Sequence, residues 1–157
     1  MSKSYPNIRM RRNRSSKFIR NLIRETSFSV DDLIYPVFIL PGKNKEESID
    51  SMPGKKRYSI DKLVPIIGKL HKKGLNAIAI FPVIGKTKKS KDAKESFNPK
   101  GLVQGAVKLL KKEFPNLGII TDVALDPYTL SGHDGIVNKD GYVLNDKTIE
   151  VLKKQAL

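Results

Sequence analysis

Residues 117–135 read LGIITDVALDPYTLSGHDG, an apolar run that changes within a few residues into an acidic loop containing glycine. Residues 117–125 are rich in Ile, Val and Leu, which predicts a buried β-strand. Acids and a histidine that come directly after a strand indicate a functional loop rather than a simple connection. The candidate residues in this stretch are Asp122, Asp126, Ser131, His133 and Asp134.

Two further apolar runs have the same character. Residues 33–40 (LIYPVFIL) and 77–84 (AIAIFPVI) are nearly continuous stretches of β-branched, aromatic and aliphatic side chains. Such runs predict strands that are buried on both faces. Pro36 has no N–H to donate, so the first part of its strand is expected at a sheet edge or a bulge.

Amphipathic stretches alternate with these strands and predict helices. Ser59 is a candidate N-cap for one of them, and Asn98 followed by Pro99 gives a strong start signal for the next. The polar segment 41–57, which contains two Pro-Gly pairs, is predicted to be a loop. The predicted helices cover residues 15–26, 59–74, 98–115 and 146–157.

The alternation of continuous apolar strands with helices predicts an α/β fold built on parallel strands. An open doubly wound sheet and a (β/α)8 TIM barrel both have this pattern. A doubly wound nucleotide-binding fold would carry a glycine-rich turn after its first strand, and this chain has a single glycine there, Gly42. A barrel places functional residues at the carboxyl ends of strands, where the acidic loop stands. We therefore expect a basic arm (1–28) followed by the first three β/α units of an incomplete barrel (29–157).

Composition narrows the class of protein. The 157 residues fit one domain, and the absence of cysteine excludes disulfides, thiolate zinc sites and a cysteine nucleophile. No apolar run approaches the roughly 18 residues of a membrane span, and the polar N-terminus has no signal-peptide core. We therefore expect a cytoplasmic protein without a membrane partner.

The formal net charge of +14 has two interpretations. A basic protein can bind nucleic acid through phosphate contacts, or its lysines can reflect general residue usage. The lysines are spread along the whole chain, tryptophan is absent and aromatic residues make up only 7%. Because stacking platforms are scarce, nucleic acid is not an expected partner.

Longer strings along the whole chain resemble one enzyme family, the delta-aminolevulinic acid dehydratases or porphobilinogen synthases, over their N-terminal half. The similar strings include RMRRNRSSKFIRNLIRETSFSVDDLIYPVFI (9–39), SMPGKKRYSID (51–61), AIAIFPVI (77–84), KDAKESFNPKGLVQGAVKLLKKEFPNLGIITDVALDPYT (91–129), GHDGIV (132–137) and DGYVLNDKTIEVLKKQAL (140–157). The resemblance implies a (β/α)8 barrel and a hydro-lyase that condenses two molecules of 5-aminolevulinate into porphobilinogen for haem and other tetrapyrroles.

The resemblance also implies how the chain assembles and what it lacks. Family members form homo-octamers in which the N-terminal arm embraces a neighbouring subunit, so Arg9, Arg11 and Arg12 are expected in a subunit contact. Two lysines on later strands form Schiff bases with the substrates, and no lysine here matches their motifs. This chain alone, as an N-terminal fragment, is therefore expected to be inactive.

The same resemblance bears on the metal. Zinc-dependent relatives have three cysteines at the positions of Ala124, Asp126 and Asp134. Oxygen ligands without a thiolate favour a hard cation, so magnesium is expected rather than zinc. Asp126 and Asp134 are expected to bind a hydrated cation or a substrate amino group. From residue type alone, they could instead cap the backbone amides of their own loop.

Three further residues receive roles by resemblance. Asp122 matches an aspartate at the barrel mouth that assists by hydrogen bonding and electrostatics, whereas from residue type it could cap a helix. His133 and Ser131 belong to a substrate-site loop, in which relatives often have a second histidine at the position of Ser131. Two alternative functions remain: a non-enzymatic basic α/β binding module, and a different barrel lyase or aldolase.

Overall fold

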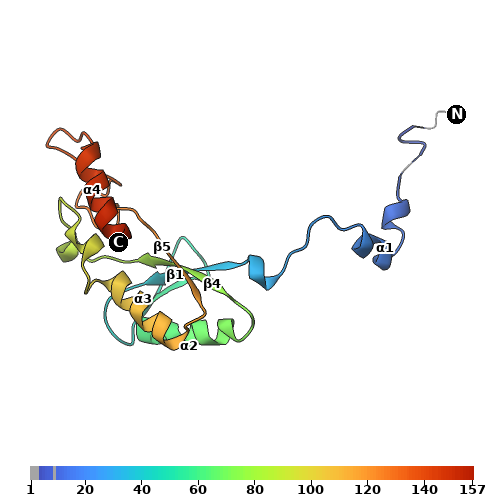
Figure 1. Ribbon diagram of the computed structural model, residues 1–157, viewed down its shortest axis with the longest axis horizontal. Helices are drawn as coiled ribbons and strands as arrows, with labels where there is room; N and C mark the ends of the chain where they lie inside the picture. Colours follow the sequence, from blue (N-terminus) through green and yellow to red (C-terminus); the bar gives the residue numbers. More distant parts are fainter. Residues whose placement is uncertain (1–3, 9) are drawn as a thin grey trace. The chain divides into compact units, whose positions relative to one another are not determined.

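The computed structural model describes residues 4–8 and 10–157, and the chain forms two compact units, Met1–Asp32 and Leu33–Leu157 (Figure 1). The described residues of the first unit form short helices: η1 (Arg12–Arg14), α1 (Lys17–Leu22) and η2 (Val30–Asp32). α1 confirms the first predicted helix. Its N-cap is Ser16, whose hydroxyl oxygen accepts a hydrogen bond from the Ile19 amide at 3.4 Å.

The arm residues expected at a subunit contact belong to this first unit. Arg9 lies outside the described residues, and Arg11 and Arg12 are exposed. Phe18 and Leu22, on α1, are also largely exposed. The arm's role in assembly stays a prediction.

The second unit is built on a five-stranded sheet in the order β2-β3-β1-β4-β5. The strands are β1 (Ile34–Ile39), β2 (Glu46–Ser48), β3 (Lys56–Tyr58), β4 (Ala77–Pro82) and β5 (Gly118–Thr121). The three strands predicted from apolar runs are confirmed as β1, β4 and β5. They run parallel, and β1 pairs with β4 over its entire length.

The prediction of a loop over 41–57 is wrong, because this segment forms a hairpin of β2 and β3. These strands have three residues each and are mostly charged, so they lack the apolar alternation that marks a strand. β3 pairs in parallel only with Phe38 and Ile39, at the end of β1. Pro36 therefore lies where β1 has no partner on that side, and the expected edge position is confirmed.

Three longer helices follow the strands: α2 (Ile60–His71), α3 (Leu102–Glu113) and α4 (Asn145–Ala156). Between β4 and α3 the chain also forms the short turns η3 (Lys86–Lys88) and η4 (Lys94–Phe97). Ser59 is confirmed at the N-cap position of α2, although its hydroxyl bonds the backbone of Lys45 rather than the helix. No helix in the described part of the chain has the length and apolar character to cross a membrane.

The predicted cap of α3 is wrong, because the helix begins after Gly101 and not after Asn98. The Asn98 side chain accepts a hydrogen bond from the Lys100 amide at 3.0 Å, and its carbonyl accepts one from Gly101 at 2.8 Å. These bonds close a tight turn that delays the helix. A β-carbon at position 101 would lie 2.9 Å from the Asn98 carbonyl oxygen, so glycine fits this turn best.

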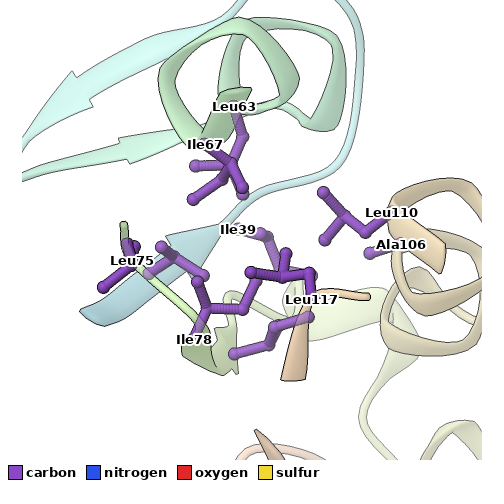
Figure 2. Packing of buried hydrophobic residues seen from close by; sticks show 10 residues of the cluster. Ile39, Leu63, Ile67, Leu75, Ile78, Ala106, Leu110 and Leu117 are labelled. Carbon is purple, nitrogen blue, oxygen red and sulfur yellow. The ribbon is translucent and has the colours of Figure 1, made fainter. Parts of the chain in front are cut away.

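The core lies between the sheet and the pair α2 and α3, which cover one face of it (Figure 1). Alternate strand residues point toward these helices, as Ile39 and Ile78 do in Figure 2. They meet Ile67 from α2 and Leu110 from α3, which are fully buried. Burial of each such side chain contributes about 1.5–3 kcal/mol, so this layer fixes the sheet against its helices.

The opposite face of the sheet carries apolar side chains that no helix in the described residues covers. Phe81 on β4 is 37% exposed and Ile120 on β5 is 46% exposed. The prediction of strands buried on both faces is therefore wrong for this chain, because helices pack on one face only. Sequential parallel strands with helices on a single face are the arrangement of a (β/α)8 barrel, whereas a doubly wound sheet has helices on both faces.

Two glycines within helices provide a test of this packing. Gly105 is an exposed residue of α3, and a β-carbon there would meet no atom within 4 Å. Gly105→Ala is expected to stabilise the protein by about 0.5–1 kcal/mol, since glycine is unfavourable inside a helix. The measurement is the free energy of unfolding in urea.

The matched control is Gly68→Ala in α2. A β-carbon at position 68 would lie 3.3 Å from the Phe114 ring, so the gain should be smaller or lost. Equal stabilisation by both substitutions would contradict the packing of Phe114 against α2.

Candidate functional site

The carboxyl ends of the parallel strands meet at one edge of the sheet, as expected for their common direction. A cavity of about 300 Å³ opens there. β5 ends at Thr121, so Asp122 is the first residue beyond the strand. The cavity is lined by residues from β1, β3, β4, α3 and the segment after β5, and these include Phe38, Arg57, Phe81, Asp122, Asp126 and Tyr128.

Three aspartates gather at this edge. The pKa of Asp126 is raised above its ordinary value, first by partial burial, then by the negative charge of Asp134 and a hydrogen bond with that side chain, and further by the charge of Asp122. Asp122 and Asp126 line the same cavity, and the hydrogen bond joins Asp134 to Asp126, although these residues span twelve positions of the sequence. The structure therefore brings together the acidic residues that the sequence singled out.

The loop returns Asp134 to Asp126 through a compact turn. The amides of Tyr128 and Thr129 donate to the Leu125 carbonyl at 2.8 and 3.0 Å. The Thr129 hydroxyl, which is buried, donates to the His133 carbonyl at 2.9 Å. A second small hydrophobic core joins this loop to Ala93, the residue before η4. It consists of Ala93, Leu125, Tyr128 and Ile136.

The two residues expected in a substrate-site loop lie apart from this cavity. Ser131 and His133 are exposed, and the Ser131 hydroxyl accepts a hydrogen bond from the His133 amide at 3.4 Å. Ser131 lines a separate cavity of about 520 Å³ beside Lys91 and Val137. The roles of Ser131 and His133 toward a substrate stay predictions.

Two cavity residues were missed by the sequence reasoning. Burial, with the charges of Glu95, Asp122 and Asp126, raises the pKa of Tyr128 to about 12, so its phenol is a neutral hydrogen-bond donor at ordinary pH. A tyrosine inside the acidic loop was a usable signal. Arg57 comes from β3, and it could not be found because this hairpin carries no strand pattern.

The donor set of the acidic group fits a hydrated hard cation. Within residues 4–8 and 10–157, no group of three or more His, Asp or Glu side chains is arranged to enclose a metal ion. Asp126 and Asp134 nevertheless place two carboxyl groups side by side, and a divalent cation bound through water would relieve their repulsion. The alternative that these two aspartates cap amides of their own loop stays an open prediction.

The helix-capping alternative for Asp122 finds no support in the structure. The residues after it form an irregular segment and a turn, and the next α-helix begins at Asn145. Asp122 instead lines the cavity at the carboxyl edge. This is the location expected for a functional aspartate of a barrel.

Comparisons with known proteins match this chain over almost its whole length. The family model described as delta-aminolevulinic acid dehydratase matches residues 7–157. The protein of that name from Bradyrhizobium diazoefficiens is 45% identical over 150 residues, which cover 96% of this chain and 42% of the relative. The Methanothermus sociabilis protein is 48% identical over 153 residues, covering 98% of this chain and 47% of the relative.

A solved structure agrees with the sequence matches. The delta-aminolevulinic acid dehydratase (porphobilinogen synthase) of Toxoplasma gondii, in complex with the reaction product porphobilinogen, superposes with a TM-score of 0.90 at 40% identity. The match covers 95% of this chain and 42% of that chain. The present chain thus spans less than half the length of these relatives.

The raised pKa of Asp126 gives a prediction on stability. Folding disfavours the ionised form of Asp126, which lowers the stability of the folded protein. This loss of stability is absent below the ordinary pKa of 3.8 and grows as the pH rises through the raised pKa of the folded state. Asp126→Asn should therefore gain stability relative to the wild type as the pH increases from about 3 to 7. The gain should stay below about 1 kcal/mol, since Asp126 is largely exposed and solvent screens its charge.

Unfolding in urea at several pH values measures this difference. In an Asp134→Asn background the effect should shrink, because the neighbouring charge is gone. A gain that does not change with pH, or that is the same in both backgrounds, would contradict the proximity of the two carboxyl groups.

Proposed function

Because this chain belongs to the delta-aminolevulinic acid dehydratase family, we propose that it supplies part of the active site of a porphobilinogen synthase. The reaction condenses two molecules of 5-aminolevulinate into porphobilinogen. The observation that carries the proposal is the acidic cavity at the carboxyl ends of β1, β4 and β5. A relative with the same fold at 40% identity binds porphobilinogen, which supports the same ligand class here.

The chemistry of the cavity suits this substrate. Each 5-aminolevulinate carries an ammonium group at one end and a carboxylate at the other. Asp122 and Asp126 can bind the ammonium group through charge-assisted hydrogen bonds, and Arg57 supplies a cation at the same cavity for the carboxylate. Tyr128, kept neutral by its raised pKa, can donate a hydrogen bond to a substrate oxygen.

The divalent metal belongs to the proposal as well. Asp126 and Asp134 would hold a magnesium ion through water, since no thiolate stands at these positions or at Ala124. A bound cation would neutralise the acidic pair and help to orient a substrate. The two lysines that the family resemblance assigns to Schiff bases lie outside the residues matched here, so Asp122 acts in this chain as an auxiliary group.

Assembly and location are further parts of the proposal. We propose that Arg11 and Arg12, with Arg9, lie in a contact between subunits of a homo-octamer, where guanidinium groups can pair with carboxylates of a neighbour. A cytoplasmic location is part of this proposal.

A fusion protein tests the activity. The present chain is joined to the C-terminal part of the Bradyrhizobium diazoefficiens relative, which is 45% identical over the matched region. We expect the fusion to form porphobilinogen from 5-aminolevulinate. We expect the 157-residue chain alone to form none, because no lysine in it matches the Schiff-base motifs of the family and β5 has a partner on only one side in the described sheet. An inactive but folded fusion would overturn the proposal, and an active isolated chain would overturn the expectation that this chain alone is inactive.

The acidic residues are tested in the same fusion. Asp126→Asn should lower kcat/KM about 100-fold, the size typical for loss of a charge that stabilises a reacting group. Asp140→Asn makes the same chemical change in the exposed turn after β5 and should stay within about twofold. Comparable losses in both variants would show that Asp126 has no special role.

Removal of divalent ions tests the metal. Treatment of the active fusion with a chelator should abolish most activity, and magnesium should restore it more effectively than zinc. The restored activity should depend on both Asp126 and Asp134. Activity that survives chelation unchanged would exclude a required metal at this pair.

A further inference from the structure

The helix that follows the acidic loop contacts both ends of it. α4, red in Figure 1, lies beside the segment that leaves β5. The Gln155 side-chain amide donates hydrogen bonds to the backbone carbonyls of Ala124 at 3.1 Å and Asp122 at 3.4 Å. Because carbonyl oxygens only accept, the NH2 group of Gln155 must face them. These bonds join residues more than thirty positions apart.

The other end of the loop is held by Thr148. Its hydroxyl oxygen accepts a hydrogen bond from the Ile136 amide at 2.9 Å and donates to the Leu144 carbonyl at 2.9 Å. Thr148 is 8% exposed, so this contact is sheltered from water. The Leu144 amide in turn donates to the Ile136 carbonyl at 2.7 Å.

Gly135 allows this close approach of loop and helix. A β-carbon at position 135 would lie 2.6 Å from a methyl carbon of Val143 and 3.2 Å from the Thr148 hydroxyl oxygen. Any side chain there would push the loop away from the start of α4. The loop therefore contacts the helix through its backbone, directly beside Asp134.

The spacing of Gln155 and Thr148 makes them act on one segment. They are seven residues apart on α4, close to two turns, so both lie on the same face about 10 Å apart along the axis. Between their contacts the chain carries Asp126 and Asp134. Because α4 holds both ends of the segment 122–136, its position influences the separation of the Asp126 and Asp134 carboxyl groups.

We propose that Gln155 and Thr148 are positioning residues. Because both lie on the rigid helix α4 and bind the two ends of the acidic segment (residues 122–136), they set the geometry of Asp122, Asp126 and Asp134. We call this pair of contacts the α4 clamp. This inference rests on the proposed function, since it concerns the same cavity. Neither residue has to touch the substrate. Gln155 sets the carbonyls on either side of Val123, and Thr148 sets the amide that ends the loop.

Hydrogen exchange of backbone amides in the full 157-residue chain tests the α4 clamp, the contacts of Gln155 and Thr148, independently of activity. Gln155→Leu removes the amide at similar size, and Thr148→Val removes the hydroxyl in the same shape. Each should raise the exchange rate of backbone amides in residues 123–136 about fivefold or more, because the segment opens more often. Thr148→Ser keeps the hydroxyl and should restore protection.

Gln104→Leu is the matched control. The Gln104 side-chain amide also donates to a backbone carbonyl, that of Ser96 at 2.9 Å, but it holds η4 rather than the acidic segment. It should lower the melting temperature about as much as Gln155→Leu while leaving exchange in 123–136 within about twofold of wild type. Equal exchange rates of the amides in 123–136 in the Gln155→Leu and Gln104→Leu variants would overturn the inference.

Kinetics of the active fusion test the functional consequence. Measured well below the melting temperature and per folded molecule, Gln155→Leu and Thr148→Val should lower kcat/KM about 10–100-fold, with Thr148→Ser near wild type. A purely structural role would lower the melting temperature and leave kcat and KM unchanged, which would overturn the inference. If the unsubstituted fusion forms no porphobilinogen, the proposed function fails, and the exchange experiment still decides whether α4 clamps the loop.

Discussion

The parallel pairing of β1 with β4 is the constraint on which the rest of this structure depends. The register joins Ile34 to Ala77 and continues without interruption to Ile39 and Pro82. Alternate side chains of both strands then point at α2 and α3, where their burial contributes most of the stability of the layer. Because β5 extends the same parallel set, the carboxyl ends of the three strands meet at one edge. The cavity exists because this register puts those ends together.

The cavity gathers like charges, which has an energetic cost. Partial burial, and after it the charges of Asp134 and Asp122, raise the pKa of Asp126 above that of an isolated aspartate. An arrangement of this kind disfavours the folded protein when its surroundings hold no cation. A substrate ammonium group or a hydrated divalent ion would remove that cost.

The uncovered apolar face of the sheet links the fold to the family. Its residues, such as Phe81 and Ile120, are those that a barrel turns toward its interior. The relatives are more than twice as long as the matched region, so they contain further strands that can enclose this face. The continuous apolar pattern of the strands is compatible with a second buried face, although only one face is covered within the described residues of this chain.

The sequence by itself determined the strands β1, β4 and β5, the helices between them, the family and the identity of the acidic residues. Local side-chain patterns were enough, because strands and helices of this length bury most of one face and so impose a regular spacing on apolar residues. The tertiary structure alone decided the hairpin of β2 and β3, the start of α3 at Gly101, and the contacts of Gln155 and Thr148 with the acidic segment. The contacts of Gln155 and Thr148 join residues that lie a dozen to more than thirty positions apart, whereas the turn before Gly101 is local. All three features depend on hydrogen bonds to backbone groups. Such a bond leaves no residue pattern in the sequence, because every residue but proline carries both a backbone donor and a backbone acceptor.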